Sequence, residues 1–356
     1  MKKILFISVL IFALVCVLSS CDLSFLPGVD MAVTSTQETT TAKVEGTTPE
    51  ETTPGKTKPE KEPPEEPEEP FVPSEGLAFL VNRDGKTCTV IGIGTCTDLD
   101  IRIGGYIDGY RVTAISDHAF SYCTSLTSVV IGDSLTSIGD YMFSYCTSLK
   151  SAAISDRVTS IGDYMFSYCT SLTSVTIGDS VTSIGEWAFN NCTSLTSIII
   201  PDSVTRIGDF AFGECFALMS VTIPDSVTSI GRAAFEECFA LTSVTIGNGV
   251  TSIGEGAFDA CTSLTSVTIP DSVTSIGRAA FGACTSLTSV TIGNSVTSIG
   301  DRAFYYCTSL TSITSNGTIE QWNAIAKGLE WDNGIGTYTI YCTNGEIAKD
   351  GTVTYY

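Results

Sequence analysis

Nine cysteines recur at a constant spacing along the chain, at Cys123, Cys146, Cys169, Cys192, Cys215, Cys238, Cys261, Cys284 and Cys307. Neighbouring thiols can form disulfides, bind zinc or act as redox centres. The number of cysteines in this series is odd, and no C-x-x-C pair occurs in it. The 356-residue chain also contains a single histidine, His118, so a zinc site lacks its usual second ligand. We therefore expect buried thiols that pack as small apolar side chains, and no metal site.

An acidic or amide side chain also recurs, after each apolar segment of the chain. The positions are Asp133, Asp156, Asp179, Asp202, Asp225, Asn248, Asp271 and Asn294. Regularly spaced oxygen ligands could form a calcium-binding edge. The exchange of Asp for Asn favours the other interpretation, in which these side chains hydrogen-bond their own backbone in turns.

The composition excludes several classes of function. The formal net charge is −21, and only 16% of residues are charged. Nucleic acid and anionic lipid surfaces both require a basic footprint, so we expect neither as a direct partner. Within the repeats no nucleophile–base pair, cofactor loop or convergent carboxylate pair stands out. We therefore expect no catalytic residue, no cofactor and no enzymatic activity.

The first 20 residues have the pattern of an export signal. Lys2 and Lys3 precede the apolar core "ILFISVLIFALVCVL", which is short for a membrane span. The following "LSSC" resembles a bacterial lipobox, which predicts lipidation of Cys21 and anchoring to a bacterial membrane through the lipid. Residues 21–70 are rich in Thr, Pro and Glu. Such a segment buries too little apolar surface to fold, which predicts a disordered stalk.

A strict repeat dominates the rest of the chain. Leu recurs from Leu126 to Leu310, Phe from Phe120 to Phe304 and Ile from Ile115 to Ile299, each with the same period as the cysteines. Constant apolar positions at such a period predict a solenoid of stacked coils over residues 112–314. Within one unit we expect a strand over 172–177, a shorter extended piece over 181–185 and a tight helical turn over 186–192.

We expect a cap at each end of the array. Residues 71–111 alternate apolar and polar positions around "NRDGK", which predicts a β-hairpin cap in which Cys88 and Cys96 could pair. Residues 315–356 begin with a capping box at Thr318. Helical spacing there continues to Leu329, and "YTIYCTNGEIAKDGTVTYY" predicts a hairpin. The sequence leaves open the state of Cys342.

The unit "SLTSVTIPDSVTSIGRAAFGAC" (263–284) closely resembles the BspA-like leucine-rich-repeat family, and the resemblance extends over about 76–356. It implies a right-handed leucine-rich-repeat solenoid, mainly β with short helical turns. It also implies export or surface display and adhesion to host matrix proteins, other bacteria or glycans. The resemblance implies no catalytic residue and no particular ligand.

Two groups of residues are candidates for partner binding. Outward positions of the first strand form rows of small hydroxyl side chains, which favour a soluble β surface and suit glycan hydrogen bonding. Aromatic residues occupy variable positions of the early repeats beyond what folding requires, although they could instead thicken the core flank. The candidates are Ser174, Thr176, Thr222, Thr245, Thr268 and Thr291 in the rows, and Tyr141, Tyr145, Tyr164, Tyr168, Trp187 and Phe210 among the aromatics.

Together these features predict a monomeric, non-catalytic, lipid-anchored module at the bacterial cell surface. Its repeat surface would recognise a protein or glycan of a host, of other bacteria or of its own envelope. The alternative is a structural scaffold of the envelope that binds only the polymers of its own cell. The sequence does not distinguish the two.

Overall fold

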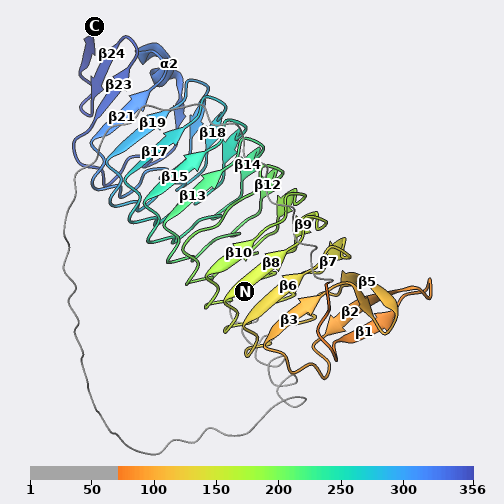
Figure 1. The fold of residues 1–356 in the computed structure, drawn as a ribbon. Helices are drawn as coiled ribbons and strands as arrows, with labels where there is room; N and C mark the ends of the chain where they lie inside the picture. Colours follow the sequence, from red (N-terminus) through yellow and green to blue (C-terminus); the bar gives the residue numbers. More distant parts are fainter. Residues whose placement is uncertain (1–70) are drawn as a thin grey trace, which may run out of the picture. The chain divides into compact units, whose positions relative to one another are not determined.

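The computed structural model describes residues 71–356. The predicted signal peptide (1–20), the predicted lipidation site Cys21 and the predicted stalk (21–70) lie outside the described residues. Residues 71–356 form a solenoid of regularly repeating coils, in which corresponding strands of successive coils lie side by side (Figure 1). The predicted solenoid fold is confirmed.

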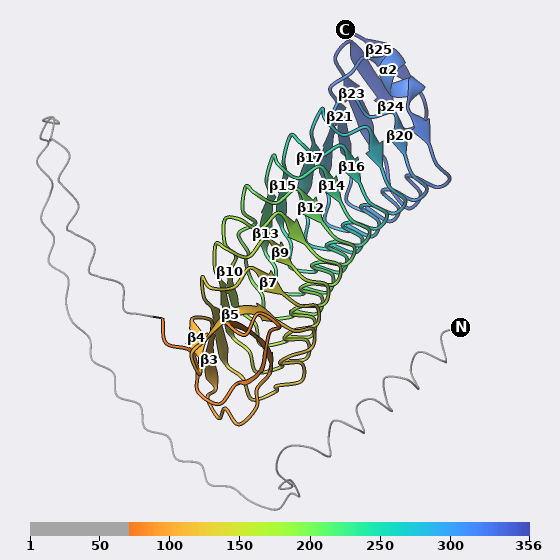
Figure 2. The same cartoon turned by 90° about the vertical axis from the view of Figure 1, so that its right-hand side faces the viewer.

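Nearly every coil contributes strands to two parallel ladders, which follow the length of the solenoid (Figure 2). The longer strands are β6 (Ser128–Ile131), β8 (Ser151–Ile154), β10 (Ser174–Thr176), β13 (Ser220–Ile223), β15 (Ser243–Ile246), β17 (Ser266–Ile269), β19 (Ser289–Ile292) and β21 (Ser312–Ser315). The shorter strands are β7 (Ser137–Ile138), β9 (Ser160–Ile161), β11 (Ser183–Ile184), β12 (Arg206–Ile207), β14 (Ser229–Ile230), β16 (Ser252–Ile253), β18 (Ser275–Ile276), β20 (Ser298–Ile299) and β22 (Ala326–Lys327).

The ladder of longer strands is interrupted once. β10 ends a four-stranded sheet and β13 begins an eight-stranded one. Between them, residues 196–200 of the intervening coil form no strand, and only the isolated bridge Ser197↔Ser220 connects that coil to β13. The ladder of shorter strands continues without interruption past this point. At this position the coils therefore lack the backbone hydrogen bonds that paired longer strands form elsewhere in the array.

The core consists of columns of identical side chains. The phenylalanines from Phe120 to Phe304 are fully buried, and consecutive rings stack with centroids 5.1–5.5 Å apart. In a representative coil Leu172, Ile177 and Ile184 are buried and Ser174 is exposed, as the strand alternation predicts. Each coil buries its apolar side chains against the coils on either side, which explains why these positions do not vary.

The cysteine column lies in the same core. Cys146 to Cys307 are buried, and all twelve cysteines between Cys88 and Cys342 carry free thiols. Each buried thiol of the series donates a hydrogen bond to a phenylalanine carbonyl of the preceding coil, as from Cys146 Sγ to Phe120 O at 3.1 Å. The prediction of buried thiols is confirmed from Cys146 to Cys307, whereas Cys123 is half-buried. Each buried thiol additionally satisfies a carbonyl that a methyl group could not. Cys88 and Cys96 do not pair with each other.

The return turn of each coil differs from the helical turn that we expected. It consists of i→i+3 hydrogen bonds, such as Asn190 N to Trp187 O at 3.1 Å, combined with two left-handed residues per coil. Their φ values lie between 49° and 62°. The first left-handed column is His118, Tyr141, Tyr164, Trp187, Phe210, Ala233, Gly256, Ala279 and Arg302, and the second is Tyr122, Tyr145, Tyr168, Asn191, Glu214, Glu237, Ala260, Ala283 and Tyr306.

Hydrogen bonding to the next coil explains this unusual conformation. The amide of Tyr141 donates to the carbonyl of Asp163 at 2.8 Å, and that of Tyr145 donates to Ser167 at 2.8 Å. An α-helical turn would direct these amides to carbonyls of its own coil instead. The left-handed residues thus add a third line of backbone hydrogen bonds between coils, at a steric cost for every residue that is not glycine.

Substitutions in the first left-handed column should change stability with opposite signs. We expect Gly256→Ala to lower the free energy of unfolding by about 1 kcal/mol and Ala279→Gly to raise it by a similar amount. An added Cβ at Gly256 meets only the Cβ of Asp259, at 3.8 Å, so conformational strain and not a clash causes the loss. Urea denaturation measures both effects. Ala280→Gly is the control and should lower the free energy of unfolding, because φ at Ala280 is not left-handed. If Gly256→Ala and Ala279→Gly changed the free energy of unfolding in the same direction, left-handed strain would not explain the effect.

The recurring glycine at the end of "VTSIG" has a different cause. A Cβ on Gly231 would lie 2.5 Å from the carbonyl carbon and oxygen of Gly208 in the preceding coil. Only a residue without a side chain permits this approach of two backbones.

Three of the recurring aspartates, Asp156, Asp225 and Asp271, bridge coils instead of bonding their own backbone. Asp156 Oδ1 accepts a hydrogen bond from the amide of Asp179 at 2.9 Å, and Asp225 Oδ1 accepts one from Asn248 at 2.6 Å. At these three positions our expectation of self-contained turns was wrong, because stacking brings the amide of the next coil within reach of the carboxylate. Asn248 and Asn294 accept no comparable bond in the described structure, but the backbone amide of each donates one to the aspartate of the preceding coil.

Non-repetitive elements flank the array. At the N-terminal end lie β1 (Ala78–Val81), β2 (Thr87–Gly92), β3 (Asp100–Ile103), β4 (Tyr106–Ile107) and β5 (Tyr110–Ile115), and at the C-terminal end lie α2 (Ile319–Ala324), β23 (Thr339–Cys342), β24 (Gly345–Ala348) and β25 (Val353–Tyr355). β1 and β2 form the predicted antiparallel hairpin. β3 and β5 already pair in parallel with strands of the array, as does β23 at the other end.

The C-terminal helix is shorter than its sequence pattern predicts. The capping box of Thr318 and Gln321 is present, and Ile319 and Trp322 are buried. The helix nevertheless ends at Ala324, and Leu329 is 78% exposed, so the expected helical spacing beyond Trp322 was wrong. The physical reason is that Ala326 and Lys327 instead form β22, which pairs with β20 and extends the ladder of shorter strands. That these elements act as caps, and the domain boundaries themselves, remain predictions.

Candidate binding surfaces of the repeat array

The rows of hydroxyl side chains lie on the outer face of the longer strands. Direct pairing places Thr222 beside Thr245, and Thr268 beside Thr291. Ser174, Thr176, Thr222, Thr245 and Thr268 are exposed, whereas Thr291 is half-buried. Within each of these pairs the side chains are spaced by the strand separation and can hydrogen-bond to a ligand laid across the coils. Between Thr176 and Thr222 the row is interrupted by Ile199.

A shallow hollow of about 450 Å³ lies on this face between β15 and β17, at its edge toward the turns. Ser243, Thr245, Ser266 and Thr268 line it, together with residues of the adjacent turns. At the turn side, Asn316 donates from Nδ2 to Asp271 Oδ1 at 3.1 Å.

The candidate aromatic residues form two ladders along the return turns, and the constant period of the repeat brings each ring over the next. Tyr141 and Tyr164 stack at 4.5 Å, and Trp187 and Phe210 stack at 4.0 Å. The first ladder is His118, Tyr141, Tyr164, Trp187 and Phe210, and the second is Tyr122, Tyr145 and Tyr168.

The first ladder ends at a cation. The guanidinium of Arg232 lies 4.8 Å from the centroid of the Phe210 ring, where the stack would otherwise present an open face. Tyr141, Tyr164, Trp187 and Phe210 are half-buried, because the rings cover one another's faces and leave edges exposed. Burial raises the pKa of Tyr141 and Tyr164 above the usual tyrosine value. Both rings thus remain neutral near pH 7 and offer hydroxyl groups at the edge of the stack.

Beyond the second ladder the same column becomes acidic, a feature that our sequence analysis missed. Glu214 and Glu237 continue the column, and Glu236 and Asp259 lie beside them. Burial raises the pKa of Glu214, Glu236 and Asp259, and the neighbouring carboxylates raise each pKa further. The period of the repeat would have shown that Glu214 and Glu237 are neighbours, because they are one period apart.

Apolar side chains are exposed near the interruption of the strand ladder, which the sequence analysis also missed. Ile199 is 84% exposed and Met219 is 55% exposed. Phe239, in the next coil, is 39% exposed and stacks on Phe216 at 5.0 Å. Each stands at a position where most other repeats carry Thr.

Within residues 71–356, no group of three or more His, Cys, Asp or Glu side chains is arranged to hold a metal ion. No helix in this part of the chain is both long enough and apolar enough to cross a bilayer.

The comparisons with known proteins agree with the fold. The family model for the BspA type leucine rich repeat region matches residues 113–241 and 228–326, with six copies. A leucine-rich repeat protein from Bacteroides ovatus is similar at 30% identity with a TM-score of 0.63, and the match covers 73% of this chain and 67% of that one. None of the curated proteins compared matches the chain.

Two further solved structures are similar with lower TM-scores. A leucine rich cell surface protein from Faecalibacterium prausnitzii matches at 29% identity and a TM-score of 0.38, covering 71% of this chain and 96% of that one. The leucine-rich repeat protein of T. pallidum matches at 26% identity and a TM-score of 0.45, covering 61% and 90%. These comparisons indicate no enzyme family.

Proposed function

We propose that this chain, which belongs to the BspA-type leucine-rich repeat family, is a non-catalytic, lipid-anchored adhesion module displayed at the bacterial cell surface. Leucine-rich repeats generally mediate protein binding, and solenoids present extended surfaces for it. The export signal and the lipobox-like "LSSC" support an anchor at Cys21. The ligand in this proposal is a protein or glycan of a host, of other bacteria or of the cell's own envelope.

The observation that carries the proposal is the first aromatic ladder. Ala233, Gly256 and Ala279 adopt the same left-handed conformation in later coils as Tyr141 and Tyr164 do in early ones. The backbone of the turn therefore does not require an aromatic side chain. The early coils nevertheless place half-buried rings there, with exposed edges. Aromatic side chains of this kind are enriched in recognition surfaces.

Removal of two rings from the ladder tests this proposal. We expect the double variant Tyr141→Ala and Tyr164→Ala to bind its partner at least about tenfold more weakly, because a tenfold loss corresponds to only about 1.4 kcal/mol of contact energy. Binding of the full-length protein to host matrix proteins, glycans and preparations of its own envelope measures the effect. Tyr306→Ala is the matched control, because Tyr306 is a left-handed aromatic residue outside both ladders.

The outcomes separate the alternatives. Loss of binding to host or bacterial ligands in the double variant, with Tyr306→Ala unchanged, supports the adhesion module. Binding to self-envelope alone supports a structural scaffold. Unchanged binding in the double variant, with its thermal stability retained, would show that the ladder is not the recognition surface.

A further inference from the structure

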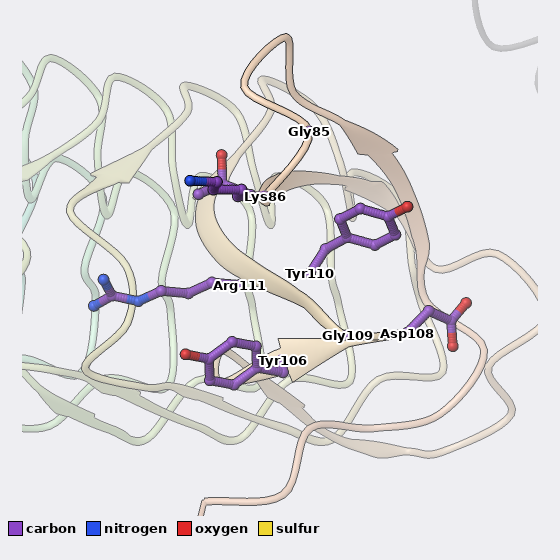
Figure 3. A pocket seen from close by; sticks show the side chains of 8 residues that line it. Gly85, Lys86, Tyr106, Asp108, Gly109, Tyr110 and Arg111 are labelled. Atoms are coloured by element: carbon purple, nitrogen blue, oxygen red, sulfur yellow. The ribbon is translucent and has the colours of Figure 1, made fainter.

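A hollow of about 470 Å³ lies outside the repeats, among the strands at the N-terminal end of the described chain (Figure 3). Its lining comes from β2, β4, β5 and the turns between them: Gly85, Lys86, Thr87, Tyr106, Asp108, Gly109, Tyr110 and Arg111. Its size is within the range of sites that bind small molecules. None of these residues was a candidate in the sequence analysis.

Strand pairing assembles the polar side chains of this hollow. Arg111 lies directly opposite Tyr106 in the antiparallel pair β4–β5 and opposite Thr87 in the parallel pair β2–β5. Residues directly opposite each other present their side chains on the same face of a sheet. Figure 3 shows the amine of Lys86, the guanidinium of Arg111 and the hydroxyl of Tyr106 extending to the same side, while the carboxylate of Asp108 points to the other.

The two cations of the hollow are available to an external anion. Lys86 and Arg111 are exposed, and neither belongs to a salt bridge in the described part of the chain. The carboxylate of Asp84, near Lys86, accepts hydrogen bonds from the amides of Lys86 and Thr87 at 2.9 Å and from the Thr87 hydroxyl at 2.8 Å. Its oxygens are therefore occupied within their own turn. Two such cations on one face are unusual in a chain of net charge −21.

An exposed aromatic ring stands beside the cations. Tyr106 is 64% exposed, and no other aromatic ring of residues 71–356 packs against it. Tyr110, on the adjacent strand, instead contacts Phe79 at a centroid distance of 6.2 Å. Tyr106 thus presents an open ring face next to Arg111.

From this arrangement we propose that the hollow binds the terminal sugar of a glycan when that sugar carries a carboxylate. Arg111 would hold the carboxylate in a bidentate pair, Lys86 would add a second positive charge, and the ring of Tyr106 would cover the apolar face of the pyranose. A terminal sugar fits better than a polyanionic chain, because the negative charge elsewhere on the protein repels further carboxylates. The site lies outside the aromatic ladders and does not depend on the function proposed for them.

Titration calorimetry of the full-length protein tests this site. The probes are trisaccharides that end in glucuronic acid or in sialic acid, and the same trisaccharides with a neutral terminal sugar. We expect an acidic probe to bind with a Kd of roughly 0.1–1 mM, which is typical of a small exposed site. Raising NaCl to about 0.5 M should weaken binding because the pair with Arg111 is exposed to solvent. The neutral probes should bind at least tenfold more weakly.

Variants distinguish this site from a general charge effect. Arg111→Gln and Tyr106→Ala should each weaken binding of the acidic probe at least tenfold, whereas Arg157→Gln and Tyr341→Ala, at exposed positions elsewhere, should not. Binding of only one acidic probe supports the proposal and identifies the sugar. Equal affinity for neutral and acidic probes, no binding of either acidic probe at about 10 mM, or unchanged affinity in Arg111→Gln would overturn it. The ladder variants Tyr141→Ala and Tyr164→Ala should bind these probes normally.

Discussion

We expect the solenoid to unfold cooperatively within about one to two pH units above pH 9, because its core contains thiols that cannot ionise while buried. Burial raises the pKa of seven consecutive thiols, from Cys146 to Cys284, and brings that of Cys215 to about 12 against an ordinary value of 9.0. Below pH 9 these thiols are protonated in both the folded and the unfolded chain. Their titration therefore does not reduce the free energy of unfolding in this range.

Above pH 9 the unfolded chain releases these protons and the folded chain does not. For each thiol, the free energy of unfolding then falls by about 1.4 kcal/mol per pH unit, until the pH reaches the pKa of that thiol in the folded chain. Seven thiols together remove roughly 10 kcal/mol per pH unit, which is comparable to the entire free energy of unfolding of an ordinary domain. The measurement is circular dichroism against pH, with thiolate absorbance recorded in parallel.

A variant with fewer thiols provides the control. In Cys192→Ser, Cys215→Ser and Cys238→Ser combined, we expect lower stability at pH 7 but a smaller dependence on pH. The number of protons released on unfolding should fall from about seven to about four, because each serine removes one titrating group. This slope does not depend on the starting stability of the variant. A slope unchanged by the three substitutions would contradict the role assigned to the thiols.

The core could be predicted from the sequence because period and burial are directly linked in a solenoid. Residues one period apart occupy the same place in successive coils, so the invariant Phe, Leu and Cys columns had to be interior. The same rule would have shown that Tyr141, Tyr164, Trp187 and Phe210 stack on one another, and that Glu214 lies beside Glu237. The ladders were therefore accessible from the period alone, although their geometry was not.

The backbone of the return turn could not be predicted in this way. Left-handed φ is usually recognised by glycine or asparagine, yet the first left-handed column contains only one glycine, Gly256, among aromatic, alanine and charged residues. The conformation is imposed by hydrogen bonds to the next coil, which no single repeat contains. The hydrogen bond from the amide of Asp179 to Asp156 was missed for the same reason.

The N-terminal hollow depends on a register between short strands. Tyr106 and Arg111 are close in the sequence and face each other because a tight turn at Asp108 and Gly109 connects β4 to β5. Thr87 reaches the same face through a parallel pairing that includes a register shift. Neither pairing belongs to the period of the repeat, so the sequence pattern does not predict it.

Truncation of one ring in the middle of the phenylalanine column should have the largest effect of any single substitution in the array. The Phe212 ring is fully buried and stacks on Phe189 at 5.2 Å and on Phe235 at 5.1 Å. We expect Phe212→Ala to lower the free energy of unfolding by about 3–5 kcal/mol, because it removes both stacking contacts and leaves a cavity.

The position of Phe212 should also divide the unfolding transition. Its coil contains residues 196–200, where the longer strand is missing and the isolated bridge Ser197↔Ser220 is the remaining link to β13. Coils interact only with their neighbours, so weakening this junction uncouples the coils on its two sides. Amide hydrogen exchange measured against urea concentration should resolve two transitions. The amide of Trp187 should report on the coils on one side of the junction and the amide of Trp322 on those on the other.

Phe239→Ala is the control, because the Phe239 ring is 39% exposed. We expect it to lower the free energy of unfolding by less than about 1 kcal/mol and to preserve a single transition. If Phe212→Ala also lowers the free energy of unfolding by less than about 1 kcal/mol, or unfolds in one cooperative transition, the junction is not the weakest point of the stack.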